Sequence, residues 1–126
     1  MRLIFIIFSL TWAFISAESQ GSVPSDDYDQ KIDSLINELY NGPFYTNFEE
    51  SIQILHEAEK LAKQYQLDAK LAEIYLNRSW LAQNFADLIL MKSEIEKAKP
   101  IITSLKVEEH PVLIGDYYYS EASYLT

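Results

Sequence analysis

From Asp27 onward, the apolar residues of this chain recur at the spacing of an α-helix. One face of the segment over residues 48–65 collects Phe48, Ile52, Leu55, Ala58, Ala62 and Tyr65. Residues three or four positions apart lie on the same helix face, so each such stripe needs a neighbouring element to cover it. Five segments of this kind follow one another, and the 126 residues include only 3 Gly and 4 Pro. The pattern predicts an all-α protein of about five helices.

Short breaks separate the predicted helices and set their approximate ends. We expect helices over residues 27–40, 48–65, 68–85, 88–105 and from 111 onward. Asn47, with Glu50 three residues later, has the spacing of a capping box at the start of the second helix. Because the connections are short, neighbouring helices should form antiparallel hairpins. Pro100 lacks a backbone donor inside the fourth helix, so a kink or a break is expected near Lys99.

Residues 1–17 have the features of a cleavable signal peptide. Arg2 supplies a short positive region, an apolar run extends from Leu3 to Ala17, and small residues end the run. A membrane-spanning helix needs about 20 apolar residues, so this run is short for a permanent anchor, which is the competing interpretation. We expect cleavage after Ala17, or alternatively after Ser19, and export to the periplasm or the cell exterior. Residues 18–27 are polar and are expected to form a flexible lead-in.

The composition narrows the choice of partners. The chain has a formal net charge of −9, and a surface of this sign repels nucleic-acid phosphates and anionic lipid head groups. We therefore expect neither nucleic acid as a partner nor a membrane beyond signal-peptide targeting. The chain has 0 Cys, so it forms no disulfide even in an oxidising compartment.

Two of the predicted helices match each other at an offset of 40 residues. Four pairs of residues align at this offset: Phe48 with Leu88, Ile52 with Lys92, Leu55 with Ile95, and Ala58 with Ala98. Three of the pairs are apolar at both positions, and the pair of Ile52 with Lys92 is not. An offset of this size is typical of repeated helical hairpins, in which each unit buries its apolar face against the next.

The order of residues in 72–100 resembles the tetratricopeptide repeat family. Tyr75 stands at the family's early aromatic position, and Asn77 and Ser79 stand where the family has Asn and a small residue. Asp87-Leu88 occupies the turn that usually reads Gly-Asp-Tyr, and Met91 departs from the family, which has Ala there. The resemblance extends over residues 28–126, as two and a half units. The repeat positions that it assigns are Phe48, Ser51, Leu55, Ala58, Tyr75, Ser79, Ala82, Leu88, Ile95 and Ala98.

The resemblance implies a right-handed solenoid of helical hairpins that acts as a non-enzymatic scaffold for a protein or peptide. The chain is similar to the exported N-terminal part of bacterial sensors, in which such repeats precede a membrane helix and an effector domain. In the third unit only Tyr119, Ala122 and Leu125 match, so we expect an incomplete repeat region or a homo-oligomer that covers the C-terminal helix. A plain helical bundle, a small helical ligand-binding protein and a self-assembling bundle remain the alternatives.

No group of residues has the spacing of a catalytic, cofactor or metal site. His56-Glu57 begins like a zinc-protease helix, but the required second His four residues later is absent, and His110 stands alone. The acidic residues at 26, 27 and 29 lack the Gly and Glu of a calcium loop and suit a helix start. Asn77-Arg78-Ser79 fits a glycosylation acceptor but lies within a predicted helix, so we interpret it as structural. Of the three tyrosines at 117–119, one or two should be exposed.

Overall fold

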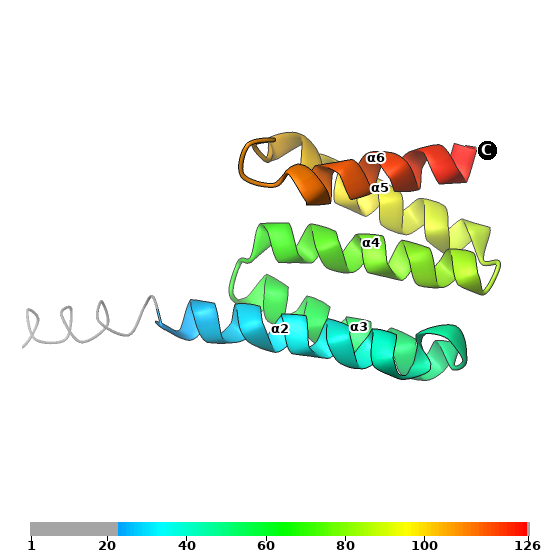
Figure 1. The fold of residues 1–126 in the computed structure, drawn as a ribbon, viewed down its shortest axis with the longest axis horizontal. Helices are drawn as coiled ribbons and strands as arrows, with labels where there is room; N and C mark the ends of the chain where they lie inside the picture. The colour runs from blue at the N-terminus through cyan, green and yellow to red at the C-terminus, as the bar shows by residue number, and fades with distance from the viewer. Residues whose placement is uncertain (1–22, 126) are drawn as a thin grey trace, which may run out of the picture.

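A computed structural model describes residues 23–125 of the chain, and the predicted signal peptide lies outside this range. Within it the chain is all-helical, as predicted, with five α-helices and no strand. The elements in chain order are α2 (Val23–Asn41), the 3-10 turn η1 (Pro43–Tyr45), α3 (Phe48–Gln64), α4 (Asp68–Asn84), α5 (Leu88–Ser104) and α6 (Pro111–Leu125) (Figure 1). No helix over these residues combines the length and apolar content that crossing a bilayer requires.

The helices form two layers. In Figure 1, α2, α4 and α6 lie side by side from bottom to top, with α3 and α5 behind them. Helix α4 packs against α3, α5 and α6, and α2 packs against α3. Two polar contacts tie α2 to α4: the Tyr40 hydroxyl donates to Asn77, and Lys70 forms an ion pair with Asp33. Helix α4 is therefore central and has nine buried residues along its length.

The first helix begins earlier than the sequence pattern indicates. Residues 23–27 are the start of α2, so the predicted flexible lead-in over residues 18–27 is wrong for its second half. Pro24 falls in the first turn of α2, where a helix needs no backbone donor, and its fixed φ suits helical geometry. Residues with turn-like composition therefore extend a helix whose apolar periodicity starts later.

The other predicted helix starts are confirmed. The Asn47 side chain accepts a hydrogen bond from the Glu50 backbone N–H at 3.0 Å and caps α3. The Asp87 side chain caps α5 in the same way, by accepting from the Leu90 N–H at 3.0 Å. Each cap satisfies one of the backbone donors that the first turn of a helix leaves free.

The expected break at Pro100 does not occur. Helix α5 continues through Pro100 to Ser104, because packing on both sides of the proline maintains the helix. Ala98 and Ile102 are both buried, whereas Pro100 itself lies on the exposed side, where its ring displaces no core side chain. The tertiary contacts thus outweigh the loss of one backbone hydrogen bond.

The turns on either side of α4 have the same backbone conformation. Gln66 has φ of 55° in the first turn and Ala86 has φ of 60° in the second. In each turn the following N–H reaches back to close the preceding helix, from Leu67 to the Ala62 carbonyl and from Asp87 to the Ala82 carbonyl, both at 2.8 Å. This is a Schellman-type helix end, which usually places Gly at the residue with positive φ.

Ala86→Gly should therefore stabilise the protein. Gly adopts positive φ without the steric penalty of a Cβ atom, so we expect the free energy of unfolding to rise by about 1 kcal/mol. Urea denaturation followed by circular dichroism measures the change. The same substitution at helical Ala98 should lower the free energy of unfolding by about 1 kcal/mol or more, since Gly weakens a helix interior. A loss of stability for Ala86→Gly would contradict the described turn.

Two hydrophobic clusters share α4. One lies between α2, α3 and α4 and includes Ile32, Leu39 and Leu55, each 0% exposed. The other lies between α4, α5 and α6 and is built from residues such as Met91 and Tyr117. Leu71 and Trp80 on α4 pack against both clusters and so join them. The core is therefore continuous through α4, and its largest groups are aliphatic and aromatic side chains on facing helices.

Candidate functional site

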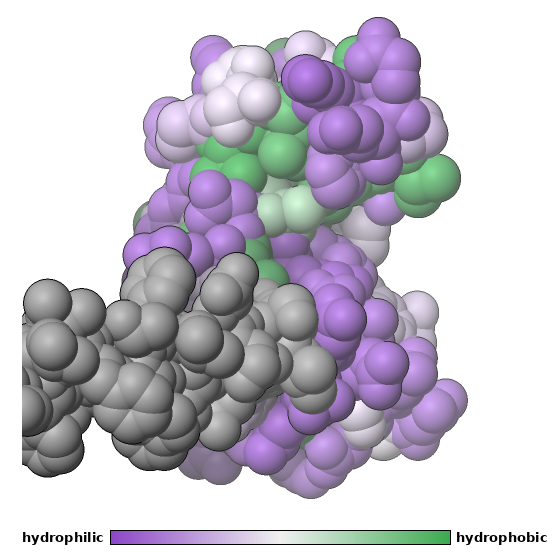
Figure 2. Space-filling model, turned by 90° about the vertical axis from the view of Figure 1, so that its left-hand side faces the viewer, coloured by the Kyte–Doolittle hydropathy of each residue, from purple (hydrophilic) through white to green (hydrophobic). Residues whose placement is uncertain are grey.

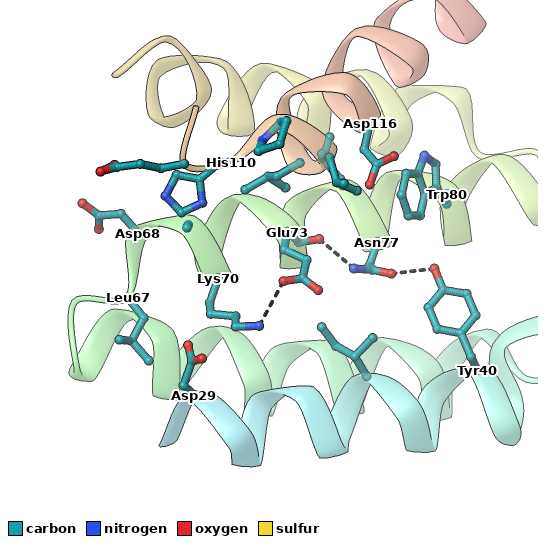
Figure 3. Close-up of a pocket in the computed structure, with 17 residues that line it drawn as sticks. Asp29, Tyr40, Leu67, Asp68, Lys70, Glu73, Asn77, Trp80, His110 and Asp116 are labelled. Atoms are coloured by element: carbon teal, nitrogen blue, oxygen red, sulfur yellow. Dashed lines mark hydrogen bonds and ion pairs between the residues drawn. The ribbon is translucent and has the colours of Figure 1, made fainter. Parts of the chain in front are cut away.

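A groove runs between α2 and α6, with α4 as its floor (Figure 3). Its volume is about 770 Å³, within the range of ligand-binding clefts. Seen end-on, hydrophobic side chains are visible mainly between the upper and lower parts of the molecule, and hydrophilic residues predominate elsewhere on that face (Figure 2). The apolar lining residues include Ile36, Leu67, Leu76, Trp80, Val112 and Leu113.

Asn77 lies at the centre of the groove floor, and its amide is occupied on both sides. The Tyr40 hydroxyl donates to Asn77 Oδ1 at 2.5 Å, and Asn77 Nδ2 donates to the Glu73 backbone carbonyl at 2.8 Å. Only 3% of Asn77 is exposed. The burial and the two hydrogen bonds of the amide agree with a structural role for the Asn77-Arg78-Ser79 sequence.

Charged groups line the end of the groove near the α3–α4 turn. Lys70 on α4 forms an ion pair with Asp33 of α2 and lies 3.4 Å from Glu73. Burial raises the pKa of Glu73; the charge of Lys70 opposes this rise, and those of Asp33 and Asp29 add to it. Two carboxylates therefore surround a lysine that can neutralise only part of their charge.

Two further groups on the walls have perturbed acid–base properties. On α6, burial raises the pKa of Asp116. On α2, burial raises the pKa of Tyr40 well above its ordinary value, and the charges of Tyr45, Glu73 and Asp116 add to the rise. Tyr40 therefore stays a neutral donor to Asn77 at any physiological pH.

Glu73→Gln should stabilise the protein at neutral pH and have no such effect in acid. The pKa of Glu73 in the folded state lies above its ordinary value of 4.5, so ionisation is disfavoured by folding. The stability associated with this group is complete below pH 4.5 and is lost as the pH rises through the folded-state pKa. The side chain is 36% exposed, and water screens it, so we expect a gain of only a few tenths of a kcal/mol at pH 7.

Thermal unfolding of the wild type and Glu73→Gln across a pH series measures this difference. Glu57→Gln, on the exposed side of α3, is the matched control, and its stability should differ little from that of the wild type across the pH series. A Glu73→Gln protein that is less stable than the wild type at neutral pH would show that the ion pair with Lys70 outweighs burial.

The groove continues along α4 toward η1. Trp80 lines it and also a second, shallower recess of about 390 Å³ with Phe44, Tyr45, Gln83 and Asn84. The Trp80 indole N–H donates to Ser120 Oγ at 2.7 Å, which fixes the ring against α6. Trp80 therefore lies where the groove meets this second recess, whose lining is partly aromatic.

The opposite face of α4 carries a buried ionic network. Arg78 donates to Glu59 of α3 and to Glu94 of α5, each at 2.7 Å. Lys63 and Lys97 complete the network at 2.8 Å from Glu59 and Glu94, respectively. Glu94 is 0% exposed, and no buried side-chain polar atom among the residues that the structure describes lacks a partner. The network holds three helices together and faces away from the groove.

The repeat positions assigned from the sequence do not form the groove. Eight of them are buried among the helices: Ser51, Leu55, Ala58, Tyr75, Ser79, Ala82, Ile95 and Ala98. Phe48 is half-buried, and Leu88 is 60% exposed. Of the two histidines, His56 is exposed on α3 and His110 lines the groove. No group of three or more potential metal ligands occurs in residues 23–125.

The ion pair between Arg78 and Glu94 is absent from the sequence-based predictions. The signal was present in the helical pattern, because Glu94 follows Met91 by three residues and precedes Ile95, which places a carboxylate on a core face. Arg78 likewise falls between Tyr75 and Ala82 on the buried face of α4. Opposite charges at core positions of consecutive helices indicate a buried ion pair, since an isolated charge there would be too costly.

In the comparisons with known proteins, no family model, no curated protein and no solved structure matches this chain. The function must therefore be inferred from the groove itself.

Proposed function

We propose that this protein is a non-enzymatic scaffold that binds a peptide segment of another protein in the groove over α4. The observation that carries the proposal is the groove itself: α2, α4 and α6 surround a volume of about 770 Å³ that is lined by both apolar and charged side chains. Tyr40, Asn77 and Lys70 are already held by internal contacts, which suits rigid recognition more than proton transfer.

A tetratricopeptide-like arrangement of hairpins is part of this proposal. Helices α2 and α3 form one hairpin and α4 and α5 the next, and the first helix of each lies in the groove layer. Ala58 and Ala98, 40 residues apart in equivalent helices, are both 0% exposed, as expected where helices approach closely. Such arrays use an extended concave surface to bind their partners.

Selection of peptides from a random displayed library tests the proposed function. Ala69 lies on the groove floor, so Ala69→Trp should fill the groove and abolish binding of the selected peptides. His56→Trp adds the same bulk on the exposed side of α3 and should leave binding unchanged. Peptides that bind both variants as well as the wild type would place the binding surface elsewhere and contradict the proposal.

We also propose that the protein is exported. Its mature N-terminus should then be Glu18, because the apolar run ends in small residues just before it. Mass spectrometry of the protein recovered from the extracytoplasmic fraction decides this. Recovery of the chain with Met1 intact in the membrane fraction would favour the uncleaved-anchor alternative.

Self-association through α6 is a second candidate function, favoured by the aromatic residues that this helix exposes. Of the three consecutive tyrosines, Tyr117 is 2% exposed, whereas Tyr118 and Tyr119 are 56% and 68% exposed. Leu125 at the end of α6 is 76% exposed. Exposed apolar patches of this kind tend to recruit partners. Analytical ultracentrifugation should then show a dimer that Tyr119→Glu dissociates, and a monomer at high concentration would argue against it.

A further inference from the structure

The charge of the groove walls points to the kind of peptide that binds there. Five carboxylates contributed by all three groove helices and the α5–α6 loop line the groove, at Asp29, Asp68, Glu73, Glu109 and Asp116. The only lysine or arginine among the lining residues is Lys70, and it is already paired with Asp33 and Glu73. An anionic ligand would therefore meet repulsion on every side, with no free cation to offset it.

Glu73 on α4 and Asp116 on α6 both line the groove, with the Glu73 carboxylate directed toward Lys70 and Asp116 on the α6 side (Figure 3). Glu73 shares its lysine with Asp33, and no ion pair joins Asp116 to any residue that the structure describes. Burial raises the pKa of both carboxyl groups, so a positive charge close to either one would favour its ionised form. The ammonium or guanidinium groups of a ligand bound in the groove would supply such charges.

The apolar part of the groove adjoins these carboxylates. Leu76 and Trp80 follow Glu73 along the floor at helical spacing, and Ile36 and Leu113 flank them from α2 and α6. Lys and Arg side chains lay their aliphatic stems on apolar surface while the charged head stays at a polar group. Helix α4 spans about 25 Å, which is the length of about seven extended residues.

We infer that the ligand of the groove is a cationic peptide segment, in which Lys or Arg side chains meet Glu73 and Asp116 and apolar side chains cover Leu76 and Trp80. This inference rests on the proposed peptide-binding function and names the chemistry of its partner. Charge complementarity between a groove lined by five acidic residues and a basic segment raises association rates and discriminates against acidic segments.

Three labelled peptides of the same length test the inference by fluorescence anisotropy with the purified protein, expressed from the full sequence. Each carries Leu at alternate positions, with Lys, Gln or Glu between them. The Lys peptide should bind at least tenfold more tightly than the Gln peptide, and the Glu peptide should bind most weakly. Added salt should weaken binding of the Lys peptide alone.

Charge-removing variants locate the interaction. Asp116→Asn and Glu73→Gln should each weaken binding of the Lys peptide about fivefold, as expected for the loss of a partly desolvated ion pair. Neither variant should change binding of the Gln peptide. Glu57→Gln removes an acid from the exposed side of α3 and should have no effect. Circular dichroism confirms that each variant is folded.

The outcomes separate the inference from the proposed function. Equal binding of all three peptides, abolished by Ala69→Trp, would show that the groove binds peptides but does not select for positive charge, and would overturn the inference alone. Binding of the Lys peptide that survives Ala69→Trp and both charge-removing variants would be general attraction to an acidic surface, and would also overturn it. Binding of none of the peptides would count against both.

Discussion

Replacing Arg78 by Ala should destabilise the protein by about 3–5 kcal/mol, the largest effect expected of any single substitution here. Arg78 is 6% exposed and donates to Glu59 and Glu94, each at 2.7 Å. Its removal leaves the fully buried Glu94 with Lys97 as its remaining partner, and Lys97 is half exposed. A buried carboxylate that loses its main partner must either remain poorly compensated or take up a proton, and both outcomes weaken the fold.

A double-mutant cycle isolates this interaction. Glu94→Ala alone should also be destabilising, and the double variant should be much less destabilised than the sum of the two, because the second change removes the carboxylate that the first left unpaired. Lys63→Ala, at the exposed end of the same network, should lower the free energy of unfolding by less than about 1 kcal/mol. Urea denaturation provides all four values, and additive effects of Arg78→Ala and Glu94→Ala would show that the two side chains do not interact.

The effect of Arg78→Ala should also depend on pH. Burial tends to raise the pKa of Glu59, but hydrogen bonds from Lys63 and Arg78 outweigh burial and hold that pKa below its ordinary value of 4.5. A carboxyl group with a lowered folded-state pKa contributes stability above its unfolded-state pKa and loses it as the pH falls through the folded-state value. The difference in free energy of unfolding between the wild type and Arg78→Ala should therefore become smaller as the pH falls below 4.5.

Most of the secondary structure follows from the sequence because its signals are local. Apolar spacing identifies all five helices, and side-chain caps at Asn47 and Asp87 fix two of their starts. The errors arise where the local signal conflicts with distant contacts. Pro100 is a helix breaker by its own chemistry, but buried Ala98 and Ile102 on either side keep α5 continuous. Pro24 carries a turn signal that a first helical turn also accommodates.

The groove could not be predicted, because its walls come from helices that are distant in the chain. Tyr40 and Asn77 are 37 residues apart and form a hydrogen bond, and Trp80 and Ser120 are 40 residues apart and do the same. None of these residues has a spacing that indicates contact. Arg78 and Glu94 are different, since each is a charged residue at a core position of its own helix and the pair could have been recognised. Tertiary packing thus determines the site, whereas helical periodicity determines the elements that bear it.

The repeat alignment treats Phe48 and Leu88 as equivalent, but the structure places them differently. Phe48 is half-buried and packs edge-on against Phe85 of the α4–α5 turn, with ring centroids 5.4 Å apart. Leu88 is the first residue of α5 and is 60% exposed. A second aligned apolar pair is buried in both helices, with Leu55 at 0% and Ile95 at 6% exposure. Equivalent sequence positions therefore contribute unequally to the core, and the difference can be measured.

Leu55→Ala and Leu88→Ala make the same chemical change and should have very different effects. Leu55→Ala removes a fully buried side chain from the cluster between α2, α3 and α4, so we expect the free energy of unfolding to fall by about 2–5 kcal/mol. Leu88→Ala removes a mostly exposed side chain and should change it by less than about 0.5 kcal/mol. Chemical denaturation of both variants and the wild type measures these changes in the free energy of unfolding. Similar losses for the two would mean that Leu88 is covered in solution, as a continuous repeat alignment implies.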